Sequence, residues 1–198
     1  MNKSTKNQKI RKIAETAIML ALATILSELA VVKLPFGGSV TFFSQVPMIV
    51  ISYRYGIKWG AFSGLVMGAI QMFFGMGNFS YVSGIAAYLI LIFADYIIAF
   101  GVLGLGGMFR NRIKNDAVAM AIGGGVVSLI RFICHFISGV TIWGDYSNGS
   151  MGAVWYSFTY NGSYMLPELI ITVIGCAVIG GIFDIRSPQI KAKIRKSK

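Results

Sequence analysis

The chain has 198 residues, of which 56% are hydrophobic and only 13% are charged. A soluble domain carries roughly 25% charged residues and could not bury so much apolar surface. The 18 lysines and arginines outnumber the 7 acidic residues and give a net charge of +11, but they lie at the chain ends and in short connections rather than on one aromatic-rich face. This composition excludes a cytosolic enzyme and a nucleic-acid-binding protein, and it predicts a protein embedded in the lipid bilayer.

Six apolar segments are expected to cross the bilayer as helices. The first runs from about Ile13 to Val32 and is too long, and lacks the cleavage pattern, for a removed signal peptide. The others cover about 43–53, 59–77, 84–109, 117–141 and 154–183, and the second segment is short for a span. Six spans of roughly 20 residues use about 120 residues, so only tails and short loops remain. The sequence therefore predicts an all-α membrane protein with one domain, residues 1–198, six transmembrane helices, and basic tails at 1–12 and 185–198.

The distribution of cations predicts the orientation of the chain. All but two of the 18 lysines and arginines fall in the two tails and in the connections after the second and fourth segments. Lys33 lies on the opposite side, and Arg131 lies inside the fifth segment. Because the cytoplasmic loops of membrane proteins are enriched in Lys and Arg, both termini are predicted to face the cytoplasm.

Polar side chains within the predicted spans indicate where a site could form. Asp95 stands in the middle of the fourth segment with no basic residue near it in sequence, and a carboxylate at that depth needs a partner or a cation. Helical spacing places polar residues on one face of the fifth segment and on one face of the sixth. These residues are Ser128, Arg131, His135 and Ser138 in the fifth, and Ser157, Asn161, Tyr164 and Glu168 in the sixth. Because consecutive spans run antiparallel, the two polar faces are predicted to meet across a pocket in the outer half of the bilayer.

Several of these residues also have a purely structural interpretation. His135 could be a packing histidine, and Trp143 could be an interfacial anchor beside the outer loop. Arg131 is interpreted as an ion-pair partner of Glu168 or Asp95, with a substrate contact as the other option.

The residues present give no support for catalysis. The sequence lacks a His-Glu-x-x-His zinc motif, paired metal ligands and a nucleotide-binding loop. Cys134 and His135 are adjacent, and neighbouring residues on a helix point about 100° apart, so the two do not form a nucleophile–base pair. We therefore expect no enzyme, no cofactor and no metal site. A pocket of carboxylates, one imidazole, an amide and aromatic rings suits a small, partly aromatic cation.

The fifth and sixth segments contain a recognisable passage, Arg131-Phe-Ile-Cys-His-Phe-Ile-Ser-Gly-Val-Thr-Ile-Trp143 followed by Trp155-Tyr-Ser-Phe-Thr-Tyr-Asn-Gly-Ser-Tyr-Met-Leu-Pro-Glu168. Together with Asp95-Tyr96 in the fourth segment and Ala17-Ile-Met-Leu-Ala21 in the first, it resembles the ThiT family. Members of this family are the thiamine-specific substrate-binding subunits of energy-coupling factor (ECF) transporters. The resemblance covers essentially the whole chain.

The resemblance implies that the chain captures thiamine outside a bacterial cell. It would then pass the vitamin inward by associating with an ECF transmembrane subunit and two cytoplasmic ATPase subunits. By the same similarity, His135, Trp143, Tyr156 and Asn161 occupy thiamine-binding positions. Asp95 stands where the family's pocket carboxylate, often Glu, would contact the aminopyrimidine ring.

The resemblance also implies a docking surface on the first segment, where Ala17 and Ala21 match the small-residue motif that contacts the transmembrane partner. Some relatives place a Trp and an acidic residue in the loop after this segment, and here that loop contains neither. Phe42, Phe43 or Gln45 could take their place.

Two alternatives stay open at this point. The first is a self-sufficient, proton-coupled secondary transporter for a small organic cation, with Asp95, His135 and Glu168 as the coupling groups. The second concerns the form of the ligand, which could be thiamine itself, a phosphate ester or a pyrimidine fragment.

Overall fold

The computed structural model describes residues 3–144 and 152–193, and within these ranges the chain is mostly helical, with seven α-helices and two short antiparallel hairpins. Among the described residues, four helical stretches are long and apolar enough to cross a membrane, namely Ile57–Phe74, Ile85–Leu103, Asp116–Thr141 and Ala153–Ile182. They correspond to the last four of the six predicted spans. The first two predicted spans correspond to helices α1 and α2, which differ from the expectation in length and composition.

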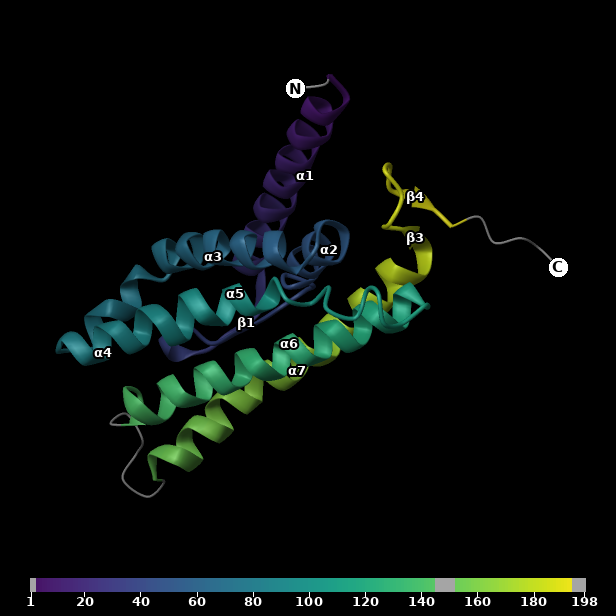
Figure 1. The fold of residues 1–198 in the computed structure, drawn as a ribbon. Coiled ribbons are helices and arrows are strands. Elements are labelled where there is room, and N and C mark those ends of the chain that lie inside the picture. The colour runs from purple at the N-terminus through teal and green to yellow at the C-terminus, as the bar shows by residue number, and fades with distance from the viewer. Residues whose placement is uncertain (1–2, 145–151, 194–198) are drawn as a thin grey trace.

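Helix α1 (Lys3–Glu28) begins inside the predicted basic tail, so this tail is helical from Lys3 onward. Its first turns project away from the other helices (Figure 1), whereas Lys12 and Glu15 contact residues of α2 and α3. Ala17 and Ala21 are both exposed on α1, beside exposed apolar residues such as Ile18.

The chain after α1 forms a β-hairpin, where the sequence predicted four more residues of helix. Strand β1 (Ala30–Lys33) pairs antiparallel with β2 (Ser39–Thr41), and the 3-10 turn η1 (Pro35–Gly37) connects them. Phe36 and Gly37 both have positive φ angles, of 63° and 92°, which permit this tight reversal of the chain. The predicted helical end at Val32 is therefore wrong, and the hairpin brings its turn toward the long C-terminal helix α7 (Ala153–Ile182).

Helix α2 (Val46–Tyr55) forms the centre of the fold. All of its residues from Val46 to Tyr53 are buried, and Met48, Ile49 and Tyr53 are fully enclosed. A helix of 10 residues spans only about 15 Å, which is about half the thickness of the hydrocarbon core. The second segment is thus shorter than an ordinary span, and it packs against α1, α3, α6 and α7.

Helix α3 (Ile57–Phe74) is followed by the 3-10 segment η2 (Met76–Tyr81) and then by the fourth apolar segment. This segment consists of α4 (Ile85–Ile90), a π-helical stretch η3 (Leu91–Ile98) and α5 (Ala99–Leu103). The predicted span 84–109 therefore stops being helical at Leu103. α3 and α5 approach closely at Gly60, where an added Cβ would lie 2.3 Å from the carbonyl oxygen of Gly104.

Helix α6 (Asp116–Thr141) and α7 lie side by side along their length (Figure 1). Their bounds agree with the predicted spans 117–141 and 154–183 to within one residue. The side chain of Asn115 caps α6 by accepting hydrogen bonds from the backbone N–H groups of Ala117 and Val118. This pair of helices carries both of the predicted polar faces.

A second hairpin follows α7 and pairs β3 (Phe183–Asp184) with β4 (Lys191–Ala192), so that only β4 lies within the predicted basic tail. The guanidinium of Arg54 fixes this segment, because it donates to the carbonyl oxygens of Ile185, Ser187 and Pro188 and pairs with Glu15 of α1 at 2.5 Å. Arg54 thus joins α1 to the segment that follows α7.

Candidate functional site

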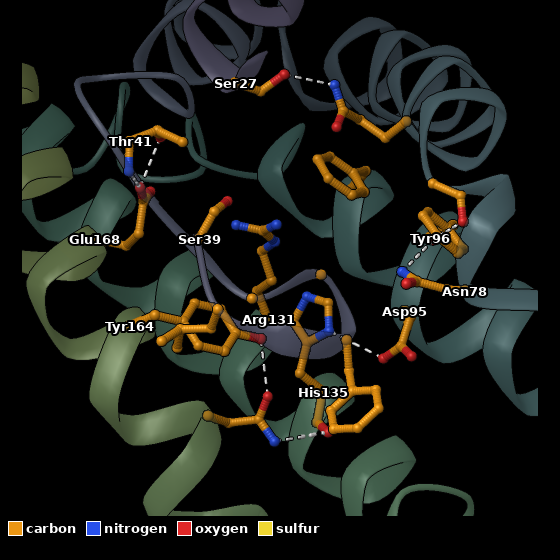
Figure 2. A pocket seen from close by; sticks show the side chains of 18 of the residues that line it. Ser27, Ser39, Thr41, Asn78, Asp95, Tyr96, Arg131, His135, Tyr164 and Glu168 are labelled. Carbon is orange, nitrogen blue, oxygen red and sulfur yellow. Dashed lines mark hydrogen bonds and ion pairs between the residues drawn. The ribbon is translucent and has the colours of Figure 1, made fainter. Parts of the chain in front are cut away.

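A cavity of about 340 Å³ lies between α3, η3, α6, α7 and the first hairpin (Figure 2). This volume falls in the range of small-molecule sites, roughly 300–1,000 Å³. The five residues predicted to bind a ligand all line it, namely Asp95, His135, Trp143, Tyr156 and Asn161. Residues from four separate segments of the sequence thus meet around one space.

Asp95 is held by donors on α6 and by Trp143 just beyond its end. Its Oδ1 lies 2.9 Å from Nδ1 of His135, and its Oδ2 accepts hydrogen bonds from Ser138 Oγ at 2.7 Å and from Trp143 Nε1 at 3.4 Å. The π-helical stretch η3 carries Asp95, and such stretches change the direction in which a side chain leaves a helix. A carboxylate has about four acceptor positions, so Asp95 retains capacity for a donor from a ligand.

One ring nitrogen of His135 contacts Asp95, and the other has no hydrogen-bond partner in the described part of the chain. Because Nδ1 faces the Asp95 carboxylate, which only accepts, we assign the ring proton of the neutral imidazole to Nδ1. Nε2 is buried and has no hydrogen-bond partner within the described part of the chain. In the neutral imidazole Nε2 is an acceptor, so Asp95 and His135 together present two acceptors to the cavity.

Asn161 connects the two polar faces of α6 and α7. Its Nδ2 donates to the backbone oxygen of His135 at 3.2 Å and to the backbone oxygen of Ser157 at 3.0 Å, while its Oδ1 accepts from Tyr164 at 2.8 Å. Gly139 makes this contact possible, because a Cβ at that position would lie 2.1 Å from Ser157 Oγ. Asn161 lines the cavity, but its hydrogen bonds fix the position of His135.

Aromatic side chains form one wall of the cavity. The indole of Trp143 is buried, and its ring centre lies 5.4 Å from that of Phe36 in the hairpin turn and 6.3 Å from that of Tyr81. On α7, Tyr156 stacks on Tyr160 with a centroid separation of 5.8 Å. Such faces suit a flat cationic ring.

The first hairpin is tied to α7 at two points. The hydroxyl of Tyr160 donates to the carbonyl oxygen of Pro35 and accepts from the backbone N–H of Gly38 at 3.1 Å. Deeper in the cavity, Glu168 accepts from the backbone N–H and the hydroxyl of Thr41 and from Gln45 Nε2 at 2.8 Å. Glu168 is thus a buried carboxylate that anchors the hairpin.

Arg131 does not form the ion pair that its structural interpretation predicted. Among the described residues it forms no ion pair with Glu168 or Asp95, since each of those carboxylates is engaged by other groups. Its guanidinium carbon lies 4.6 Å from the ring centre of Phe100, and its Nε is buried without a partner in the described ranges. Arg131 lines the cavity, beside His135 one turn further along α6 (Figure 2).

The contribution of the loop after the first segment was the largest gap in the sequence-based prediction. Gln45 lines the cavity, as does Phe36, whereas Phe42 and Phe43 are exposed. The pattern Pro35-Phe-Gly-Gly, which indicates a turn, could have revealed the hairpin.

Two further expectations concern the tryptophans near the outer loop and a metal site. Trp143, for which an interfacial anchor was the alternative interpretation, is buried beside the cavity, whereas Trp155 is exposed at the surface. Tyr146 lies outside the described residues. Within the described ranges there is no group of three His, Cys, Asp or Glu side chains placed to hold a metal ion.

Comparison with known proteins identifies relatives along the whole chain. A family model described as "Thiamine transporter protein (Thia_YuaJ)" matches residues 13–188. The thiamine transporter ThiT of Bacillus subtilis is 31% identical over 196 residues, which cover 93% of this chain and 96% of the relative. The thiamine transporter ThiT of Lacticaseibacillus paracasei is 26% identical over 208 residues, which cover 97% of this chain and 96% of the relative.

The fold has also been observed in a solved structure, that of ThiT from Listeria monocytogenes, with a TM-score of 0.70 and 22% sequence identity. The match covers 87% of this chain and 94% of that chain. These findings confirm the predicted resemblance, the multi-pass bacterial membrane location and the expectation of a transporter rather than an enzyme. With 176 of its residues, from 13 to 188, matched by the family model, this chain belongs to the thiamine transporter family.

Proposed function

We propose that this chain captures thiamine from outside the cell in the cavity between α6, α7 and the first hairpin. The binding residues are Asp95, His135, Trp143, Tyr156 and Asn161. The observation that carries the proposal is the convergence of these side chains, from separate parts of the sequence, on one cavity of suitable size.

The chemistry of thiamine matches the groups that this cavity offers. The amino group of its pyrimidine ring has two N–H donors, and Asp95 with His135 Nε2 provides two acceptors. The thiazolium ring is a permanent cation, which the Asp95 carboxylate and the faces of Trp143 and Tyr156 stabilise. Asn161 contributes by holding His135 in place through its backbone oxygen.

The proposed function also implies how the chain crosses the membrane and which partners it needs. The chain would cross the membrane six times with both termini in the cytoplasm, and α2 would form a short span enclosed by the other helices. It would deliver thiamine by docking the exposed face of α1 around Ala17 and Ala21 onto an ECF transmembrane subunit that works with two cytoplasmic ATPase subunits. The chain itself holds no nucleotide-binding motif in its sequence, so the energy must come from these partners.

Tryptophan fluorescence tests the binding step. Purified protein titrated with thiamine should show saturable quenching at submicromolar concentrations. Trp143→Phe should lose most of this signal because Trp143 lines the cavity, whereas the matched variant Trp155→Phe should keep it because Trp155 is exposed. The absence of a saturable response in the unmodified protein would refute the proposal.

Liposome uptake separates this function from the proton-coupled alternative. Liposomes that contain this chain alone should accumulate no thiamine under a pH gradient. Uptake should require the ECF transmembrane subunit, the two ATPase subunits and ATP. Accumulation driven by the pH gradient alone would favour a secondary transporter.

A further inference from the structure

A second cavity, of about 350 Å³, lies between α1, the end of α2 and the segment after α7. It shares no lining residue with the cavity around Asp95 and His135. The charged side chains that line it are all cationic among the described residues, and they are Arg11, Lys12, Arg54 and Arg186. Three separate parts of the sequence thus bring positive charge to one hollow.

On the side formed by α1, one carboxylate serves several cations. Glu15 pairs with Arg11 at 2.7 Å and with Arg54 at 2.5 Å. Lys12 forms no ion pair with the described part of the chain, and its Nζ lies 3.9 Å from the ring centre of Trp59. A single negative charge therefore accompanies three positive charges at this wall of the cavity.

The segment after α7 adds to this excess. Asp116 of α6 pairs with Arg186 at 2.7 Å and also with Lys193 at 3.1 Å. A surplus of positive charge thus remains around the cavity after all the ion pairs of the described ranges are taken into account. Such a surplus raises the local concentration of anions.

The hydrogen bonds of these cations show which of them could hold a ligand. Arg54 uses all five of its N–H groups, on Glu15 and on three backbone carbonyl oxygens of the segment after α7, so it fixes the wall of the cavity. Arg11 bonds through Nε alone, and Arg186 through Nε and Nη2. The other guanidinium N–H groups of these two arginines, and Nζ of Lys12, have no hydrogen-bond partner within residues 3–144 and 152–193. Guanidinium and ammonium donors of this kind bind phosphate oxygens.

The cavity lies at the level where membrane-spanning helices end. Tyr55, which lines it, comes two residues before α3, and Arg186 comes four residues after the end of α7. Trp59, in contact with Lys12, stands in the first turn of α3. Aromatic and basic side chains gather at the level of the lipid headgroups in membrane proteins. A phosphate at this place therefore comes from a lipid rather than from solution.

We propose that this cavity binds the headgroup of an anionic phospholipid through its phosphate. Arg11 and Arg186 donate to the phosphate oxygens, Lys12 supplies further positive charge, and Arg54 keeps the wall in place. Basic pockets between membrane helices are suited to such headgroups. The proposed orientation places the site in the cytoplasmic leaflet, and only that placement rests on the proposed function, because the site lies outside the thiamine cavity.

Native mass spectrometry of the protein in detergent tests the proposal. Phosphatidylglycerol and phosphatidylcholine are titrated separately, because both contain a phosphate but the choline cation neutralises that of phosphatidylcholine. The unmodified protein should bind one phosphatidylglycerol about tenfold more tightly than phosphatidylcholine. The double variant Arg11→Gln with Lys12→Gln should lose this preference. The control Arg112→Gln with Lys114→Gln removes the same charges from exposed positions outside the cavity and should keep it.

Thermal unfolding gives a second measurement of the same site. Phosphatidylglycerol should raise the Tm of the unmodified protein and of the control, but not that of the Arg11 and Lys12 double variant, because only a bound ligand stabilises the folded state. Equal affinities of the unmodified protein for the two lipids would overturn the proposal, as would an unchanged preference in the double variant. If inorganic phosphate displaced phosphatidylglycerol at equal concentration, the site would hold a dissolved anion, and the lipid assignment would be wrong.

Thiamine titrations on the same samples keep this inference distinct from the proposed function. The Arg11 and Lys12 double variant should bind thiamine as the unmodified protein does, because both residues lie outside the thiamine cavity. A lack of thiamine binding by the unmodified protein would contradict the proposed function, whereas the ratio of the two lipid affinities alone decides whether the headgroup site exists.

Discussion

The Nδ1 atom of His135 lies 2.9 Å from Oδ1 of Asp95, and this contact joins α6 to the π-helical stretch of the fourth segment. Both groups lie in the cavity wall, and their side chains are 13% and 15% exposed. The pair fixes the tautomer of the imidazole and directs the free Nε2 toward the cavity. Under the proposed function, this arrangement accounts for two costly polar groups inside the membrane, because together they would accept hydrogen bonds from the ligand.

Replacement of Asp95 by Asn should weaken thiamine binding, because the change removes the negative charge that faces the ligand but keeps the shape. The expected loss is about 1.5–3 kcal/mol, the range for a hydrogen bond to a charged group, or roughly 10- to 150-fold in affinity. Calorimetric titration of the variant measures this loss. Asp184→Asn, in strand β3, is the control and should bind as the unmodified protein does. If Asp95→Asn bound thiamine as tightly as the unmodified protein does, the Asp95 carboxylate would have a structural role only.

Gly139→Ala should separate α6 from α7. The new Cβ would lie 2.1 Å from Ser157 Oγ and 2.9 Å from Asn161 Nδ2, so the helices must move apart or the hydrogen bonds to His135 must break. We expect a destabilisation of about 1–3 kcal/mol, as for other overpacked sites, with weaker thiamine binding. Thermal unfolding in detergent and ligand titration measure both effects.

Gly162→Ala on α7 is the matched control for this change. A Cβ at Gly162 would meet nothing within 4 Å, so the substitution should be neutral or slightly stabilising. A stable, fully binding Gly139→Ala protein would show that the close contact between α6 and α7 is not needed for the site.

Tyr160→Phe should loosen the first hairpin. The hydroxyl of Tyr160 donates to the carbonyl oxygen of Pro35 and accepts from the N–H of Gly38, and its removal leaves both hairpin groups without this partner. We expect thiamine to dissociate faster by about fivefold, which corresponds to about 1 kcal/mol for the lost hydrogen bonding. Stopped-flow fluorescence measures the rate. Tyr88→Phe, on α4, should leave the rate unchanged, and an unaltered rate in both variants would rule out a role of this contact in retaining the ligand.

Bulky substitutions on α1 should separate binding from transport. Ala17→Leu with Ala21→Leu enlarges the exposed face of α1, which lies outside the cavity, so thiamine affinity should be unchanged. Uptake by cells should fall to background if this face docks onto the transmembrane partner. Ala86→Leu, at an exposed position on α4, is the control and should transport normally. Normal uptake by the α1 variant would exclude this face as the docking surface.

Helical periodicity was sufficient to predict that the polar faces of the fifth and sixth segments meet. The spacing of His135 and Ser138, and that of Ser157 and Asn161, placed each pair on one face of a helix, and these faces meet in the structure. Long apolar segments with turn signals on both sides also gave the bounds of α6 and α7 to within one residue. Such features depend on local sequence, which periodicity describes well.

Other parts of the site depend on contacts between distant segments. Val31 and Val32 were assigned to the first helix because they extend an apolar segment, but their branched side chains and the following Pro35 and Gly37 favour a hairpin. The π-helical stretch around Asp95 leaves no mark in a hydrophobic pattern. That Arg131 forms no ion pair with Asp95 or Glu168 in the described part of the chain could not be deduced either, because it depends on which donors contact these two carboxylates.

A structure determined with thiamine bound tests the central claim most directly. The account predicts one thiamine per chain in this cavity, with the pyrimidine amino group within hydrogen-bond distance of Asp95 and His135 Nε2 and with the thiazolium ring against the aromatic wall. Thiamine density at any other place, or thiamine in the cavity with its amino group directed away from Asp95 and His135, would contradict it.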